Sequence, residues 1–200
     1  MAKTASIARL IKDIKRLHAK YAEDLPSEDI DAIFRHLEGP YHEGPDPSVI
    51  LGKYGTPELA EQMDRIIRGA PRIPEEMTTY RGTSVEGAVP KNQYPFTTSY
   101  DPSPAETYAE SWMGNPKNPA LMMEIEVPRG SPGLMFDEET LEEITGQMLP
   151  FGDELELLLP SSKLEHLRRS VKDIGDPTGE TLRLEQKRYI PPYKARGGLV

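Results

Sequence analysis

The stretch Gly152-Asp153-Glu154-Leu155-Glu156-Leu157-Leu158-Leu159-Pro160 determines how the rest of the chain is interpreted. A short apolar run bounded by glycine and proline is typical of a buried strand rather than a helix. Because alternate residues of a strand share a face, Glu154 and Glu156 would stand on one face with Cα atoms about 6–7 Å apart. Two like charges at that distance repel each other and add no stability. The pair therefore indicates a functional site; the alternative is an ordinary exposed strand start that is acidic.

The composition predicts one soluble domain spanning residues 1–200, long enough to bury a core. The chain has no cysteine, which excludes a disulfide framework, a thiolate metal site and a cysteine nucleophile. It shows neither a membrane-spanning run nor a signal peptide, so we expect a cytoplasmic monomer, in a host cytoplasm if it is phage-encoded or delivered. The net charge of −9 argues against binding to nucleic acid, which needs positive partners for its phosphates.

Helices are expected first and strands second, which is an α+β fold. Apolar residues at helical spacing predict helices over 5–21, from Ser27 to Gly39-Pro40 and from Thr56-Pro57 to Gly69, a helical part within residues 1–70. The β-rich core, 77–190, is predicted to hold strands at 77–80, 96–100, 121–127, 155–159, 163–172 and 181–190. Within it, Ser103-Pro104-Ala105-Glu106 has the form of a capping box that starts a helix ending near Gly114, and a short helix is expected over 138–148.

Three short segments follow one another in this β-rich core. They are Tyr80-Arg81-Gly82, Phe96-Thr97-Thr98-Ser99 and Glu154-Leu155-Glu156 with the apolar run up to Pro160. Each alone is common, but the three in this order, with a helix after the hydroxyl cluster, resemble the Arg–Ser–Glu class of mono-ADP-ribosyltransferases. That class includes C3-like and binary bacterial toxins and phage-encoded transferases. The resemblance covers roughly residues 57–190 and implies a mixed β-sandwich core behind the N-terminal helices.

The resemblance implies that NAD is a substrate whose bond between nicotinamide and ribose is broken. By position against the motif, Glu156 would hold a ribose hydroxyl and stabilise the oxocarbenium-like transition state, as carboxylates do in glycoside hydrolysis. Arg81 would pair with the NAD diphosphate, a task that suits a planar, permanently charged guanidinium; a surface salt bridge is the alternative. Gly82 would let its backbone approach and hold the nicotinamide amide.

The hydroxyl cluster departs from the family pattern, because the usual leading serine is Thr97 here. A threonine hydroxyl can still orient Glu156, although its methyl group adds bulk at the ribose. Thr97 and Ser99 are therefore candidate NAD-binding residues, and an ordinary strand is the alternative interpretation. The four histidines show no paired ligand spacing, so no metal is predicted.

The residue two before the catalytic glutamate indicates the acceptor. In this family a glutamate at that place accompanies arginine acceptors, whereas a glutamine accompanies asparagine or small GTPase targets; here the residue is Glu154. A guanidinium is strongly basic and stays protonated, so it is a poor nucleophile and needs a carboxylate to bind and activate it. Phe151 occupies the place where the family often has an aromatic residue that contacts the target.

The leading hypothesis is thus an NAD-dependent transferase that moves ADP-ribose to an arginine of a target protein and releases nicotinamide. The first alternative is an NAD glycohydrolase with the same site and water as the acceptor. The second is a non-catalytic binding module on the same scaffold.

Overall fold

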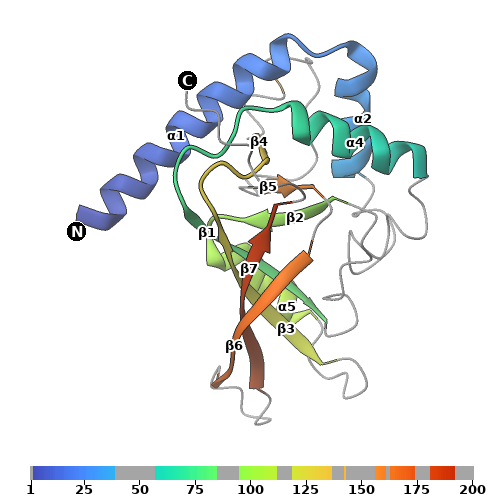
Figure 1. Cartoon of the computed structure of the whole chain (residues 1–200). Coiled ribbons are helices and arrows are strands. Elements are labelled where there is room, and N and C mark those ends of the chain that lie inside the picture. The colour runs from blue at the N-terminus through green and yellow to red at the C-terminus, as the bar shows by residue number, and fades with distance from the viewer. Residues whose placement is uncertain are drawn as a thin grey trace.

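The described residues form three N-terminal helices and a seven-stranded sheet that carries one further helix (Figure 1). The computed structural model describes residues 2–38, 57–84, 95–111, 119–136, 142, 156–160, 163–173 and 181–191. The helices are α1 (Ala2–Glu23), α2 (Ser27–Glu38), α4 (Pro57–Gly69) and α5 (Pro102–Glu110). The strands are β1 (Met77–Ser84), β2 (Phe96–Ser99), β3 (Ala120–Val127), β4 (Leu134–Phe136), β5 (Glu156–Leu159), β6 (Lys163–Asp173) and β7 (Thr181–Ile190).

The predicted order of the described helices and strands is confirmed, with five local differences. Helix α5 ends at Glu110 rather than near Gly114. The first helix extends beyond 5–21 at both ends, and β1 continues past Tyr80 to Ser84, so that Arg81 lies inside the strand rather than at its end. Strand β4 was not predicted. The capping box at Ser103 is wrong, because Asp101 caps α5 and its side chain accepts a hydrogen bond from the Ser103 N–H at 2.8 Å. The expected 138–148 helix lies outside the described residues except for Glu142.

The sheet runs in the order β4-β5-β2-β1-β3-β7-β6. Strands β3 and β7 are parallel, and the other described neighbours are antiparallel. In Figure 1 the helices α1, α2 and α4 gather at one end of the sheet, and the β6–β7 ribbon extends to the other. The short strand β5 therefore lies between the edge strand β4 and β2, near the three helices.

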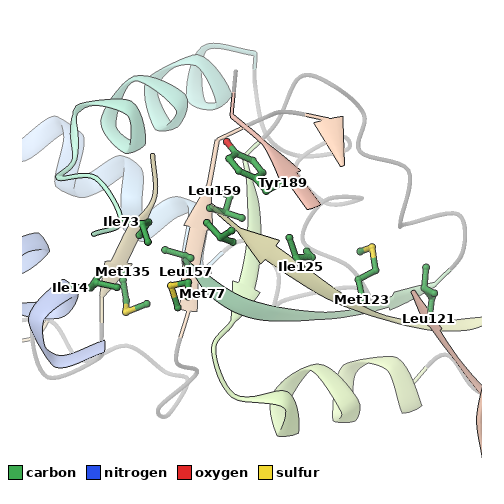
Figure 2. Packing of buried hydrophobic residues seen from close by; sticks show 11 residues of the cluster. Ile14, Ile73, Met77, Leu121, Met123, Ile125, Met135, Leu157, Leu159 and Tyr189 are labelled. Carbon is green, nitrogen blue, oxygen red and sulfur yellow. The ribbon is translucent and has the colours of Figure 1, made fainter. Parts of the chain in front are cut away.

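The apolar run of β5 is buried on both faces, as its composition predicts. Leu157 and Leu159 belong to the main core cluster, which Figure 2 shows with residues of β1, β3, β4 and β7. Leu158 faces the other way, into the cluster formed with α2 and α4. Full burial of a leucine side chain stabilises a fold by about 1.5–3 kcal/mol. These three residues fix β5, and with it the position of Glu156 at the start of the strand.

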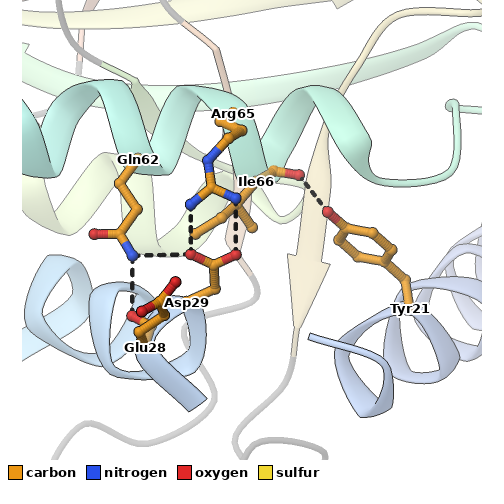
Figure 3. A network of polar contacts seen from close by, with 6 residues as sticks. All are labelled: Tyr21, Glu28, Asp29, Gln62, Arg65 and Ile66. Carbon is orange, nitrogen blue, oxygen red and sulfur yellow. Dashed lines mark hydrogen bonds and ion pairs between the residues drawn. The ribbon is translucent and has the colours of Figure 1, made fainter. Parts of the chain in front are cut away.

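Polar contacts hold α2 and α1 on α4 (Figure 3). Arg65 binds Asp29 through two hydrogen bonds of 2.7 and 3.0 Å, and Gln62 donates a third to the same carboxylate at 2.8 Å. Burial alone would raise the pKa of Asp29, but these hydrogen bonds and the charge of Arg65 outweigh it and lower the pKa. The Tyr21 hydroxyl donates to the Ile66 carbonyl at 2.9 Å, which joins α1 to the same helix.

Helix α5 packs against β1 at Gly82. A Cβ atom added there would lie 1.8 Å from the Ala105 carbonyl oxygen and 2.6 Å from the Ala109 backbone nitrogen. Real Cβ atoms do not approach backbone atoms so closely, so any side chain would push the helix away from the sheet. The absence of a side chain at position 82 is therefore explained by helix packing.

We expect Gly82→Ala to lower the free energy of unfolding by about 1–3 kcal/mol or more, as overpacking does. Urea unfolding followed by circular dichroism measures the change. Thr78→Ala is the matched control, because Thr78 is exposed on the same strand. Equal stability of Gly82→Ala and the wild type would contradict the close packing of α5 on β1.

Candidate functional site

The candidate site lies where β1, β2 and β5 run side by side. Strand β2 pairs with β5 along its full length, with Ser99 opposite Glu156 and Thr97 opposite Leu158. On its other side, β2 pairs with β1 through Tyr80 and Ser99. Since cross-strand partners share a face, positions 97, 99 and 156 lie on one face of the β2–β5 ladder. The structure thus brings together the hydroxyl cluster and the strand of the second glutamate.

Arg81 is the residue of β1 directly after Tyr80, which pairs with Ser99 of β2. Its side chain is buried, with 7% exposed, and Nη1 donates a hydrogen bond to the Thr97 carbonyl oxygen at 2.8 Å. The interpretation of Arg81 as a surface salt bridge is therefore wrong: the residue is a fixed, buried cation attached to β2.

The hydroxyl residues of β2 have different partners. Thr98 Oγ1 donates to the Leu157 carbonyl oxygen at 3.0 Å, which ties β2 to β5 on the face opposite Thr97. Ser99 Oγ accepts from the Asp101 backbone N–H at 3.1 Å and so shapes the turn into α5. Thr97 is half-buried. Thr98 and Ser99 thus have structural hydrogen bonds. Thr97, on the same strand, pairs with Leu158 of β5.

Of the two glutamates predicted for the site, the structure describes only Glu156. Glu156 is the first residue of β5, and its backbone is in register with Ser99 on one side and Phe136 on the other. Glu154 and Phe151 lie outside the described residues. Among the described residues no group of three His, Cys, Asp or Glu side chains could hold a metal ion, and no described helix is long and apolar enough to span a membrane.

Tyr80 borders the site from β1. Burial raises the pKa of its hydroxyl, and the charges of Glu124 and Asp101 raise it further. The phenol is therefore neutral at physiological pH. Three neighbouring strands thus hold a buried cation, two hydroxyl positions and a carboxylate residue, which are groups that suit an anionic ligand with a polar sugar. Tyr80 pairs with Ser99, so Arg81 starts from the face opposite positions 97, 99 and 156 and contacts β2 through the Thr97 carbonyl oxygen.

Asp101 is the site-bordering residue that the sequence interpretation missed. Its carboxylate caps α5, which begins at Pro102, three residues after Ser99. The signal was present as the pair Asp101-Pro102, because aspartate is a preferred N-cap and proline a preferred first helical residue. The competing pattern at Ser103 obscured it.

No family model and no curated protein matches the chain, but solved structures do. Plx2a, an ADP-ribosyltransferase toxin from Paenibacillus larvae, is 16% identical with a TM-score of 0.62, over 92% of this chain and 96% of that one. Vis toxin, an ADP-ribosyltransferase from Vibrio splendidus, is 13% identical with a TM-score of 0.53, over 96% and 88%. C3stau2 from S. aureus, solved with NAD, is 13% identical with a TM-score of 0.54, over 90% and 95%.

These structures cover nearly the whole chain, including both the helical part and the sheet. Their sequence identities are too low to transfer a specific substrate or acceptor. They agree with the resemblance found in the three motifs, and the chain has the fold of the ADP-ribosyltransferase toxins.

Proposed function

We propose that the chain is a mono-ADP-ribosyltransferase that moves ADP-ribose from NAD to an arginine of a target protein and releases nicotinamide. The observation that carries the proposal is the position of Arg81, the hydroxyl cluster and Glu156 on three neighbouring strands of this fold. That a structural neighbour, C3stau2, was solved with NAD supports NAD as the substrate.

In the proposed reaction the bond between the ribose C1′ and the nicotinamide nitrogen breaks, and positive charge develops on the ribose. The carboxylate of Glu156 stabilises that charge, and Thr97 orients it, since its position on β2 shares the face of position 156. Arg81 neutralises the NAD diphosphate. Its hydrogen bond to Thr97 fixes the guanidinium before NAD binds, which lowers the entropy lost on binding. Ser99 holds the turn beside them, and the Gly82 backbone binds the nicotinamide amide.

A guanidinium nitrogen of the acceptor then attacks C1′, and its proton passes to Glu154. By its place in the motif, two residues before Glu156, Glu154 is suited to bind the acceptor while Glu156 serves the donor. Phe151 contacts the target protein next to this arginine. The products are ADP-ribosyl-arginine and nicotinamide.

Arg81→Lys tests the assignment of the diphosphate site. The lysine keeps the charge but loses the fork and the hydrogen bond to Thr97, so NAD affinity should fall roughly 10- to 100-fold, as for the loss of a charge-assisted hydrogen bond. Isothermal titration calorimetry measures the affinity, and urea unfolding measures the accompanying stability change. Arg72→Lys is the matched control, because Arg72 is exposed. NAD affinity equal to the wild type would show that Arg81 is structural.

The function itself is tested by incubating the protein with labelled NAD, agmatine and cell lysate. Labelled agmatine and labelled protein bands would support transfer to arginine. Release of nicotinamide with free ADP-ribose alone would instead identify an NAD glycohydrolase. Binding without any turnover would identify a binding module on this scaffold. Mass spectrometry of the labelled bands would then locate the modified residue in the target.

A further inference from the structure

His18 on α1 is a buried histidine that uses both ring nitrogens. Only 1% of the residue is exposed. Its Nδ1 accepts a hydrogen bond from the Met135 backbone N–H at 2.9 Å, and its Nε2 lies 2.9 Å from the Pro71 carbonyl oxygen. Because Nδ1 is an acceptor, the proton is on Nε2, which donates to Pro71. The contact with Met135 requires the neutral imidazole, because a protonated ring has no acceptor at Nδ1, whereas the contact with Pro71 needs only the Nε2 proton.

His18 joins α1 to two other segments of the chain, and both of these segments are connected to strands of the candidate site. Met135 lies on β4, the edge strand of the sheet, and Pro71 lies in the connection from α4 to β1. Strand β4 pairs only with β5 in the described sheet, with Met135 opposite Leu157 and Phe136 opposite Glu156. An edge strand has backbone N–H groups without a strand partner, and His18 satisfies one of them. Helix α1 thus fixes the outer side of the strand pair on which Glu156 stands.

The surroundings of His18 favour the neutral ring. Burial lowers its pKa, and the hydrogen bond that Nε2 donates to the Pro71 carbonyl oxygen, which raises the pKa, does not offset this effect. One turn away on α1 are Lys15, whose ammonium lies 5.7 Å from the centre of the Tyr100 ring, and Tyr21, which donates to Ile66. Arg72, beside Pro71, is exposed, and residues 131–136 of the β4 segment include no ionisable side chain. The carboxylates of these segments, Asp13, Glu23, Glu75 and Glu76, are exposed or half-buried, and none of them contributes to the pKa of His18.

We propose that neutral His18 is a positioning residue, which holds β4 and, through it, the start of β5 at Glu156 in place. Protonation of His18 breaks its contact with β4 and loosens this strand pair. A second ring proton on Nδ1 would point at the Met135 N–H, so the protonated ring must leave its place or push β4 away. The consequence for activity rests on the proposed function, whereas the consequence for β4 and β5 does not.

The pH range follows from the direction of the shift. Above about pH 6.5 the imidazole is neutral in the folded and the unfolded chain, and the contact is intact. As the pH falls below that value, the unfolded chain takes up a proton that the folded chain does not. Each unit of pH then shifts the unfolding equilibrium up to about tenfold toward the unfolded chain, until the lower pKa of the folded state is reached.

Amide hydrogen exchange of the full chain at about pH 7.5 and about pH 5.5, corrected for the intrinsic exchange rate, tests the proposal. In the wild type the amides of Met135 and of β5 should lose about tenfold or more of their protection at the lower pH. His18→Asn replaces Nδ1 with a carbonyl acceptor that does not titrate, so its β5 protection should not change between the two pH values. His166→Gln on β6 is the control and should behave like the wild type.

Equal protection of Met135 in the wild type at both pH values would overturn the proposal, even if His18→Asn did not fold. Exposure of Met135 without any change in β5 would overturn the positioning role. Nicotinamide release should decrease over the same pH range in the wild type and not in His18→Asn. A wild type without turnover at any pH would contradict the proposed function instead, and the exchange of β5 would still decide the role of His18.

Discussion

Glu156→Gln is expected to lower the rate of nicotinamide release by roughly 10²–10³, the usual loss when one electrostatic contact to a transition state is removed. Glutamine has the shape of glutamate but not the charge that opposes the oxocarbenium ion. The backbone of Glu156 is in register with Ser99 and Phe136 at the start of a buried strand. NAD affinity should remain close to that of the wild type, since the charge is needed mainly in the transition state.

The measurement is nicotinamide release at saturating NAD, together with calorimetric NAD binding. Glu165→Gln on β6 is a suitable control, because Glu165 is exposed and lies on the opposite edge strand. Near-normal turnover of Glu156→Gln would remove Glu156 from the catalytic role. Loss of NAD binding in proportion to turnover would show that it acts in the ground state as well.

The fold was largely predictable because its elements have strong local patterns. Ser27 and the pair Thr56-Pro57 mark helix starts, and the structure has α2 and α4 begin at Ser27 and Pro57. The apolar run Leu157–Leu159, bounded by proline, is buried on both faces. By contrast, β4 is three residues long, which is too short for an alternating pattern to be recognised.

What the sequence could not predict depends on contacts between distant residues. The packing of Gly82 against Ala105 and Ala109 is set by how α5 docks on the sheet, and a glycine in a strand gives no indication of it. His18 contacts residues 53 and 117 positions away, so its role could not be derived from ligand spacing. Arg81 was recognised from its motif, but its attachment to the Thr97 carbonyl is a property of the sheet register.

Glu154→Gln is expected to lower transfer to arginine by roughly 10²–10⁴, the contribution of a positioned general base. A neutral amide can neither pair with the guanidinium nor accept its proton. Slow hydrolysis of NAD to free ADP-ribose should persist, because water needs no deprotonation of a strongly basic group before it attacks. The variant should therefore convert the transferase into a weak glycohydrolase.

Both products of one reaction decide between the possible roles of Glu154: the agmatine adduct and free nicotinamide, compared among the wild type, Glu154→Gln and Asp153→Asn. Asp153 is the matched control, because it is a carboxylate next to Glu154 in the sequence but lies outside the motif Glu154-Leu155-Glu156. Loss of both products in equal proportion would mean that Glu154 belongs to the NAD site together with Glu156. Unchanged agmatine labelling would show that arginine is not selected by this residue. Selective loss of the adduct, with nicotinamide release retained, would separate the acceptor carboxylate from the donor carboxylate two residues later.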